Sequence, residues 1–539
     1  MDFIFGTLAT DELKLIHHRV LRRGVQHNHD LSPRDPRPGD AVTLTVRVGQ
    51  DVIADHVTVY YTTDGSFPAG KRGTALNGHV LPLTRVDYVW DTLAWGYIAV
   101  WQGALPPQPN DVFVRYRIGA WSTAGEGEIF ADYPEFKATT ERAAAAFFKG
   151  EPVPKDIPPT FARVDTFNFH VDNHQPPQWA KDAVIYQIFV DRFYPGDGRE
   201  WLPAKDLMDF HGGTLWGVRD KLNYLTDLGI TCIWLTPIFP GPTHHGYDAT
   251  DYLSVEPRYG GDEALHALVE AAHARGIRIL LDLAASHLSN QHPYFVEALE
   301  NLRSPYREYF SFDDKDPIGY RTFFGVPSMP SINLQSPVAR AWMCDVAKYW
   351  LREFDVDGYR LDHANGPGPD FWTEFQAACK SVKPDCLTFG AVVETPDILR
   401  AYVGRLDGLL DFQIEDALRK TYAFGTMSEK EFEHFVERHY VYFPSEFVMP
   451  TFLDNHDMDR FLFVAQGNKE ALRRAAAAQM RLPQPPIIYY GTEVGLSQRD
   501  GKGTFGLEVS RLPMLWGEAQ DHSLLSYYKG LIFARRSAF

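Results

Sequence analysis

From Trp179 onward, short apolar runs rich in β-branched residues alternate with amphipathic segments of helical period. Parallel strands need this pattern, because both faces of such a sheet are buried and a crossover helix joins each strand to the next. Eight strand candidates follow in order: 183–190, 231–238, 277–284, 357–363, 387–393, 407–412, 447–455 and 485–492. Eight strand–helix units in about 360 residues predict a (β/α)8 TIM barrel, although a doubly wound open sheet has the same local pattern.

Two of the intervening helices carry terminal signals. Asp262 is a candidate N-cap. Ser336 and Pro337 are typical of an N-cap and a first helical residue, and they predict a helix that runs to about Phe354. The stretch 288–335, between the third strand and its helix, is too long for an ordinary loop, so we expect a small excursion domain over the barrel mouth.

Residues 1–137 have a different pattern. Short alternating segments such as 56–63 and 111–121 are separated by Gly, Pro and Asp turns, which is typical of an all-β sandwich. A short helical segment and a Pro-rich stretch follow, which is typical of a linker. We therefore predict an N-terminal β-sandwich at 1–137, a linker at 138–178 and a catalytic barrel at 179–539.

Charge and hydropathy exclude several classes of partner. The net charge of −17 argues against nucleic acid, because proteins that bind it concentrate Lys and Arg to neutralise phosphates. No apolar run approaches the roughly 20 residues of a membrane span. The start, MDFIFGTLATDELKL, lacks the basic region, apolar stretch and cleavage site of a signal peptide. We therefore expect a cytoplasmic protein with a neutral ligand and no membrane contact.

The four cysteines, Cys232, Cys344, Cys379 and Cys386, form no CxxC pair. Three of them lie within apolar strand or helix patterns, which argues against a disulfide framework and against metal binding. We expect buried thiols.

Acidic, basic and histidine side chains gather at the predicted strand ends, where barrel enzymes place their catalytic residues. Arg360 and Asp362 end the fourth strand two positions apart, so both can point inward, and the guanidinium favours an ionised carboxylate. The third strand ends with Asp282 and His287, and the seventh with DNHD at 454–457. Separate structural salt bridges explain this clustering poorly, which favours a catalytic site.

Carboxylates at a barrel rim suit the cleavage of glycosidic bonds. One carboxylate attacks or stabilises the oxocarbenium-like centre, and one carboxylic acid protonates the leaving oxygen. A zinc site of His245, His287 and His456 is an alternative, but no HxH or HExxH spacing is present and carboxylates outnumber histidines. We therefore expect no metal at this site.

Four segments resemble, in the right order, the catalytic motifs of the α-amylase family (glycoside hydrolase family 13): DLAASH (282–287), GYRLDHANG (358–366), FGAVVE (389–394) and FLDNHD (452–457). SMPSINLQSP (328–337) is similar to the family's fifth motif. The resemblance covers about residues 180–535 and is strongest to the neopullulanase, cyclomaltodextrinase and maltogenic amylase branch. It implies α-glucosidic substrates and retention at the anomeric carbon.

Carried over position by position, the resemblance implies a role for each matching residue. Asp362 would be the nucleophile, and Asp457 would stabilise the transition state. Tyr247 would stack on the sugar being cleaved. The residues that would hold this sugar and the nucleophile are His287, Arg360 and His456.

The family's general acid/base is a Glu near the end of the fifth strand, and this chain has Ala391 at that position. Alanine can neither donate nor accept a proton, so an acceleration of order 10² to 10⁴ would be lost. We favour a deliberate Glu-to-Ala replacement that traps intact substrate, because the other motif residues are unchanged. Alternatively Glu394, past the strand and near a helix start, serves as the acid.

Other departures from the family pattern bear on the prediction. Ser286 stands where the family often has an Asn for a structural calcium, so we expect no cofactor. Gly366 replaces a Glu that is usual in the neopullulanase branch. Asp248 and Asp282 fit either substrate contact or scaffold. The sequence ends at LIFARRSAF, in the expected eighth barrel helix, so we expect the usual C-terminal β-sandwich to be absent.

The leading hypothesis is a retaining hydrolase of maltooligosaccharides, cyclodextrins or related α-glucans, with some transglycosylation. The enzyme alternative is a chain-end α-glucosidase or a glucosyltransferase of the same family. The alternative of another class is a non-catalytic α-glucan-binding protein that has lost its acid/base. In the resembling branch the N-terminal sandwich often packs over a neighbour's active site, which implies a homodimer through that domain.

Overall fold

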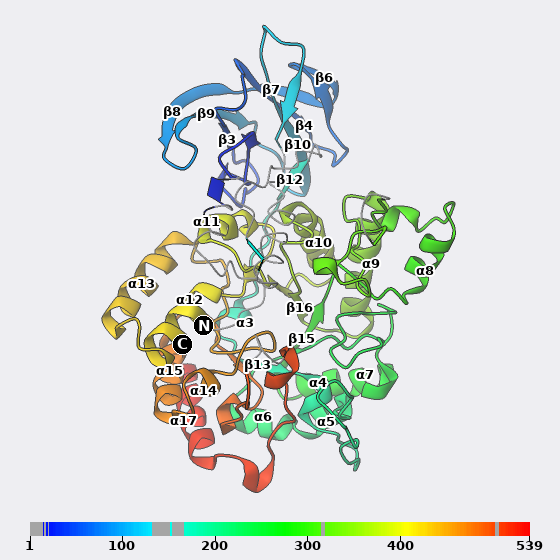
Figure 1. The fold of residues 1–539 in the computed structure, drawn as a ribbon, viewed down its shortest axis with the longest axis vertical. Coiled ribbons are helices and arrows are strands. Elements are labelled where there is room, and N and C mark those ends of the chain that lie inside the picture. Colours follow the sequence, from blue (N-terminus) through cyan, green and yellow to red (C-terminus); the bar gives the residue numbers. More distant parts are fainter. Residues whose placement is uncertain are drawn as a thin grey trace.

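A β-domain and a larger α/β domain lie one above the other in Figure 1. This computed structural model describes residues 15, 18–19, 21–131, 151–152, 166–313, 318–501 and 506–538. The helical segment expected at the start of the linker lies outside these residues. Within the described ranges, no helix has the length and apolar character needed to cross a bilayer.

Two antiparallel sheets form the N-terminal domain. One has the order β1-β3-β9-β8 with β2 on β3, and the other has the order β11-β10-β4-β7 with β12 on β10. Their strands are β1 Val25–Gln26, β2 Leu31–Ser32, β3 Val42–Val48, β4 His56–Thr62, β7 His79–Pro82, β8 Thr84–Asp91, β9 Gly96–Leu105, β10 Val112–Trp121, β11 Glu128–Phe130 and β12 Phe167–Val171; β5 Ala69–Lys71 and β6 Thr74–Asn77 form a separate hairpin. Alternate residues of both sheets, such as Val46 and Val59, share one buried core, which makes the domain a sandwich.

Strand β12 lies inside the segment expected to be linker. It pairs antiparallel with β10, from Val112↔Val171 to Tyr116↔Phe167, and all five of its residues are buried. The sandwich therefore extends to Val171, beyond the predicted boundary at residue 137. The sequence pattern did not predict this strand, because its polar residues are not all on a solvent-facing side. Asn168, for example, is buried against the barrel domain.

Parallel strands form the barrel sheet in the order β18-β17-β16-β15-β14-β13-β19. They are β13 Ile185–Ile188, β14 Cys232–Leu235, β15 Arg278–Leu283, β16 Gly358–Leu361, β17 Leu387–Gly390, β18 Gly408–Leu409 and β19 Ile487–Tyr489. The expected seventh strand is an extended segment, in which parallel bridges join Val448 to Gly408 and Thr451 to Pro486. These bridges connect β18 to β19 and close the ring, so the predicted (β/α)8 fold is confirmed.

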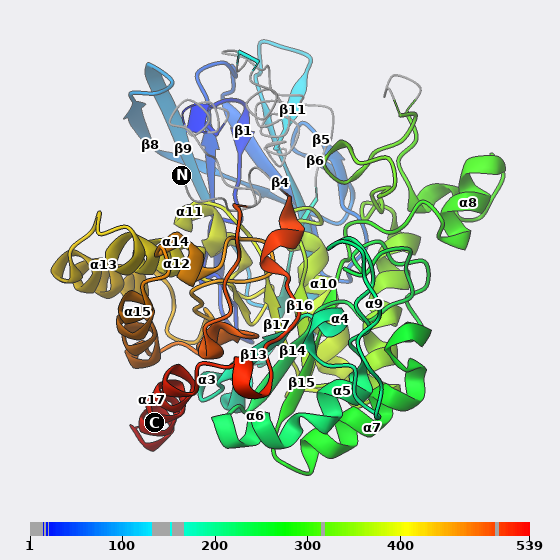
Figure 2. The same cartoon turned by 60° about the horizontal axis from the view of Figure 1, so that its bottom comes forward.

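Helices flank the barrel strands on their outer side, as α6, α7 and α9 do in Figure 2. The helices are α3 Gln178–Lys181, α4 Val190–Phe193, α5 Leu215–Asp220, α6 Leu222–Leu228, α7 Gly261–His273, α8 Pro293–Glu300, α9 Pro337–Glu353, α10 Pro369–Val382, α11 Pro396–Leu399, α12 Phe412–Leu418, α13 Glu429–Tyr442, α14 Phe461–Val464, α15 Lys469–Arg481 and α17 His522–Ala538. Ser336 is the N-cap residue of α9 and Phe354 its C-cap, as predicted. Asp262 is not an N-cap, because α7 starts one residue earlier and the Asp262 carboxylate accepts a hydrogen bond from Val255 N–H.

The excursion between β15 and α9 contains α8, which stands away from the barrel in Figure 1. Isolated antiparallel bridges, Thr322↔Pro330 and Phe312↔Tyr320, hold its loops together. A third bridge, His287↔Ser331, ties the excursion to the end of the third barrel strand. The excursion is thereby fixed at the mouth of the barrel.

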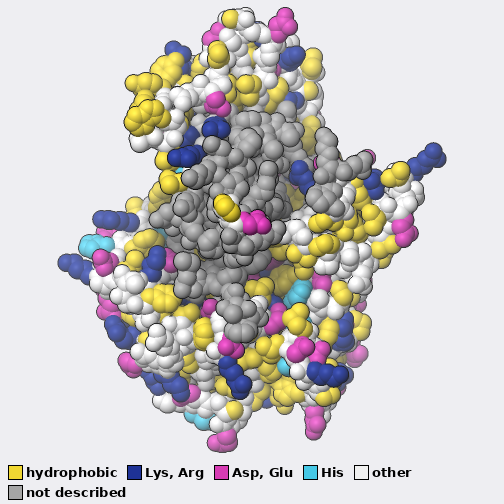
Figure 3. Space-filling model, viewed as in Figure 1, with side chains coloured by type: hydrophobic (Ala, Val, Ile, Leu, Met, Phe, Trp, Pro, Cys, Tyr) yellow, Lys and Arg dark blue, Asp and Glu magenta, His cyan; other side chains and the backbone are white. Residues whose placement is uncertain are grey.

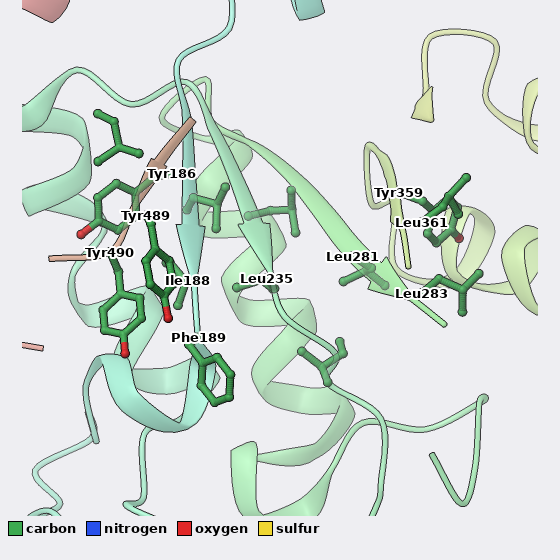
Figure 4. Packing of buried hydrophobic residues seen from close by; sticks show 14 of the residues in the cluster. Tyr186, Ile188, Phe189, Leu235, Leu281, Leu283, Tyr359, Leu361, Tyr489 and Tyr490 are labelled. Carbon is green, nitrogen blue, oxygen red and sulfur yellow. The ribbon is translucent and has the colours of Figure 1, made fainter. Parts of the chain in front are cut away.

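Alternation along the barrel strands creates two cores. Leu281 and Leu361 point outward and pack beneath the helices, and Figure 4 shows them with their neighbours on adjacent strands. Leu280 and Phe389 belong to the separate cluster inside the barrel. Because successive side chains point to opposite faces, every second residue from these positions also points inward. The inward positions at the strand ends are Asp282, Arg360, Asp362 and Ala391.

Candidate active site

A pocket of about 950 Å³, including its open mouth, lies beyond the carboxyl ends of the barrel strands. Its lining comprises His245, Tyr247, His287, Phe323, Phe324, Met329, Arg360, Asp362, His363, Asn365, Ala391, Val393, Phe412, Asp457, Leu507 and Arg511. Six of the seven predicted site positions are therefore together in one cavity. The seventh, His456, is fully buried behind Tyr247.

Arg360 is the centre of the polar network. Its Nη1 donates to both carboxylate oxygens of Asp282, at 2.9 Å each, and to Oδ1 of Asp362 at 3.0 Å. The guanidinium also lies over the Trp234 ring, 5.0 Å from its centroid. The predicted pairing of Arg360 with Asp362 is present, and Asp282 acts as scaffold, because it contacts Arg360 and does not line the pocket.

The register of β16 and β17 places positions 362 and 391 next to each other. Leu361 pairs with Gly390, and the Ala391 N–H donates to the Leu361 carbonyl at 2.9 Å. Asp362 and Ala391 are the next residues of the two strands, and both line the pocket. A side chain longer than alanine at 391 would thus project into the cavity beside the Asp362 carboxylate.

Asp457 has a different environment from Asp362. Arg511 Nη2 donates to its Oδ1 at 3.2 Å, and His456 Nε2 lies 3.1 Å from its Oδ2. Burial alone would raise the pKa of Asp457, but His456 and Arg511 outweigh that effect and hold the pKa well below its usual range. Asp457 is therefore a fixed negative charge in the pocket.

Tyr247 joins these groups. Its hydroxyl lies 2.9 Å from Asp282 Oδ2 and 2.6 Å from His456 Nε2, and its ring is parallel to the His456 ring within 6°. Gln187 Nε2 donates to His456 Nδ1 at 2.6 Å, which leaves the proton of the neutral imidazole on Nε2. Burial lowers the pKa of His456, although Asp457 opposes the effect, so the neutral form is favoured.

Aromatic side chains form one wall of the pocket. His287 stacks on Phe323 with ring centroids 4.2 Å apart, and Phe324 meets His363 edge-on at 5.1 Å. Phe324 and His363 both have left-handed backbone conformations, which aim their rings at the cavity. Of these wall residues, only His287 was predicted from the sequence. An apolar surface of this kind suits the non-polar faces of sugar rings.

Arg511 was also missed as a site residue. It donates to Asp457 and, through Nε, to the His456 carbonyl at 3.0 Å. The segment RLPMLW, which begins with Arg511, has a counterpart in the family, and this was the one signal that could have identified it.

The alternative acid, Glu394, does not line the pocket. It lies three positions after Ala391, and Val393 lines the cavity instead. Burial raises the pKa of Glu394 to about 7, with Asp397 adding to the effect, so its carboxyl is protonated more easily than usual. The Glu394 carboxyl nevertheless lies outside the pocket, so its proton is not available to a molecule bound there.

The zinc alternative has no support in the described part of the chain. His245, His287 and His456 do not form a group with metal-ligand spacing there. The Ser286 hydroxyl lies 2.8 Å from His287 Nδ1. Asp248 accepts a hydrogen bond from Thr243 at 2.6 Å and is absent from the pocket lining, which makes it scaffold.

Residues 187–526 match the family model described as the alpha-amylase catalytic domain. The chain belongs to the alpha-amylase family. Alpha-amylase 2 of Dictyoglomus thermophilum is 41% identical over 372 residues, which are 68% of this chain and 65% of that protein. Neopullulanase 2 of Thermoactinomyces vulgaris is 35% identical over 379 residues, which are 67% of this chain and 63% of that protein. This chain thus spans less than two thirds of the length of these curated relatives.

Solved structures of alpha-amylase family proteins share the fold. The cyclic α-maltosyl-(1→6)-maltose hydrolase from Arthrobacter globiformis, in complex with that sugar, is 31% identical with a TM-score of 0.62, over 67% of this chain and 84% of its own. A cyclomaltodextrinase is 28% identical with a TM-score of 0.63, over 95% of this chain and 84% of its own. The second match extends beyond the barrel, so that protein shares the N-terminal domain as well.

The two carboxylates of the pocket are expected to titrate very differently. Burial raises the pKa of Asp362 to about 7, because Arg360 only partly offsets the loss of water. Arg360 lowers the pKa of Asp362, as expected of a neighbouring guanidinium, but burial outweighs this effect. Infrared difference spectra between this chain and its Asp362→Asn variant should show a carboxylate band that disappears as the pH falls through about 7.

Asp457→Asn is the matched control for this titration, because its carboxylate band should persist in acid. A midpoint for Asp362 near the ordinary value of about 3.9 would contradict the predicted effect of burial.

Proposed function

We propose that this chain has the active site of a retaining hydrolase of α-glucosidic bonds, with Asp362 as nucleophile and Asp457 as transition-state stabiliser. The observation that carries this proposal is that Asp362, Asp457 and position 391 line one sugar-sized pocket at the barrel mouth. Membership of the alpha-amylase family supports the same assignment. Maltooligosaccharides and cyclodextrins are the substrates we propose, on the strength of the named relatives.

In this reaction the Asp362 carboxylate attacks the anomeric carbon while the bond to the leaving oxygen breaks. A glycosyl ester on Asp362 forms, and attack by water on the same carbon releases the sugar with its configuration retained. Arg360 orients Asp362 through the 3.0 Å hydrogen bond. Asp457 remains ionised, so it can accept hydrogen bonds from the sugar hydroxyls and stabilise positive charge at the ring.

Ala391 removes the proton donor for the leaving oxygen, so we propose that the chain binds natural glucans and cleaves them very slowly. Restoring the acid in the Ala391→Glu variant should increase maltooligosaccharide hydrolysis by about 10² to 10⁴ or more. The measurement is the rate of reducing-sugar release by both proteins. A variant that stays inactive would contradict the proposed role of position 391.

Glu394→Gln in the Ala391→Glu background is the control for the alternative acid. The restored rate should persist in this double variant, since Glu394 does not line the pocket. The codon for residue 391 in the source gene separates two origins of the alanine: a glutamate codon indicates a deliberate replacement, whereas an alanine codon favours a natural glucan-binding protein.

A glycosyl donor whose leaving group needs no protonation should show whether Asp362 can act as nucleophile in the chain with Ala391. Fluoride leaves α-maltosyl fluoride as an anion without protonation, so Asp362 can form the glycosyl ester unaided. We expect a burst of about one fluoride per protein, followed by slow turnover because no base activates water. Azide, an anion small enough for the space beside Ala391, should attack the ester and give α-maltosyl azide.

Asp362→Ala should abolish the fluoride burst, and the released ion is measured with a fluoride electrode. Absence of a burst from the unaltered chain would contradict an enzymatic active site and would favour the non-catalytic binding protein.

We also propose a cytoplasmic location. The intracellular maltogenic amylase of Bacillus subtilis, 34% identical over 388 residues, supports this proposal, because that relative is named as intracellular.

A homodimer through the N-terminal sandwich is proposed from its exposed edge. Strand β8 is the last strand of its sheet, and hydrophobic side chains gather around it in Figure 3. Trp90, Trp95 and Tyr97 are 47%, 74% and 61% exposed there. A long apolar edge strand in a protein normally has a partner, and a second copy of the chain is the occupant we propose.

Replacing Trp90 and Tyr97 by Asp should convert the dimer to a monomer, as measured by light scattering after gel filtration. Leu76→Asp is the control, because Leu76 is 80% exposed on the separate β5–β6 hairpin of the same domain. A monomeric unaltered chain would contradict the proposed dimer.

A further inference from the structure

Three residues with metal-binding side chains follow one another where the chain leaves the sandwich: His170, Asp172 and His174. His170 belongs to β12, and Asp172 and His174 follow the end of that strand at intervals of two residues. One ligand atom from each lies within 4.8 Å of the others, and no other group of this kind is found in the described ranges. None of the three lines the active-site pocket.

Two of the three ligand pairs have separations close to those around a small tetrahedral metal ion. His170 Nδ1 lies 2.7 Å from Asp172 Oδ2, and His174 Nδ1 lies 3.6 Å from Asp172 Oδ1. Ligands bound to zinc at 2.0–2.1 Å with tetrahedral angles are about 3.4 Å apart. The two observed separations bracket that value, so small shifts of the side chains would complete the geometry.

The second nitrogen of His170 has the partner that metal-bound histidines usually have. Nε2 lies 3.1 Å from Asp111 Oδ1, and the ring stacks on Phe113 with centroids 4.2 Å apart. A carboxylate at this nitrogen fixes the ring and holds the proton on Nε2. The lone pair of a neutral imidazole is then on Nδ1, the nitrogen that lies 2.7 Å from Asp172 Oδ2.

His170 Nδ1 is a buried polar atom without a well-formed hydrogen bond. The side chain is only 5% exposed, and the short contact with Asp172 does not have the angles of a hydrogen bond. A nitrogen lone pair and a carboxylate oxygen 2.7 Å apart repel unless a cation compensates them. A metal ion would supply that charge, and His174 Nδ1, 3.6 Å from the same carboxylate, favours a metal site.

The backbone that carries the ligands is anchored. Arg37 Nη1 donates to the carbonyl oxygens of Asp172 and His174, at 3.3 and 2.7 Å. The same Arg37 atom is 3.9 Å from Asp172 Oδ1, which also accepts a hydrogen bond from the His174 backbone N–H at 2.6 Å, so Oδ2 is the oxygen left for a metal ion. A cavity bordered by Asp172 and His174 adjoins the cluster and gives a water molecule access to a fourth coordination position.

We propose that His170, Asp172 and His174 bind a divalent transition-metal ion of the zinc class, with water as fourth ligand. Two imidazole nitrogens and one carboxylate oxygen suit zinc, cobalt or nickel, and not calcium, which prefers oxygen ligands throughout. The ion fixes the chain where it leaves β12 for the barrel, so it stabilises the junction between the two domains.

Titration of the tag-free, chelator-treated full chain with Co²⁺ tests this proposal. We expect one equivalent to bind and to give the intense visible absorption of tetrahedral cobalt, and Zn²⁺ to displace it. Zn²⁺ should also raise the unfolding temperature, since an ion that binds only the folded state stabilises it.

His174→Gln is the informative variant, because its side chain is 37% exposed and its removal should leave the fold intact. It should weaken cobalt binding at least tenfold and eliminate the zinc-dependent rise in unfolding temperature. His434→Gln, at a 59% exposed histidine beside Glu437, is the matched control and should change neither. No stoichiometric cobalt binding, or equal binding by the His174→Gln variant, would overturn the metal site.

Discussion

One buried guanidinium determines the geometry of the barrel mouth. Arg360 is 2% exposed, and a cation without partners at this depth would destabilise the fold by several kcal/mol. Asp282 and Asp362 compensate its charge, while Tyr247 and Trp234 donate to the Asp282 carboxylate. Asp362 is therefore held by a network that begins on two neighbouring strands, and any change in their register would leave a charge unpaired.

The same network explains why the proposed loss of an acid at position 391 has no substitute in the proposed reaction. Among the described residues that line the pocket, only Asp362 and Asp457 are acids. Asp362 must be ionised to attack, and His456 and Arg511 keep Asp457 ionised, so neither carboxylate can deliver a proton to the leaving oxygen. Glu394 has a pKa suited to an acid but lies outside the cavity.

Positions fixed by strand alternation could be predicted from the sequence, and positions fixed by loops could not. Arg360, Asp362 and Ala391 follow directly from the period of two along buried strands. Phe323 belongs to the excursion, whose path depends on bridges between segments that are distant in sequence. Arg511 lies in a segment without regular structure, so only its motif could have placed it near Asp457.

Strand β12 packs against both domains, and for that reason its sequence pattern does not identify it as a strand. Phe169 faces the sandwich core, whereas Asn168 donates through its backbone N–H to Asp370 of α10 at 2.7 Å and through its side chain to the Asp370 carbonyl. His29 also contacts Asp370. Since both faces of β12 are buried, neither alternation nor solvent exposure marks it as a strand. Both domains contact this strand directly, so the position of the sandwich beside the barrel depends on side chains that a linker prediction would treat as solvent-exposed.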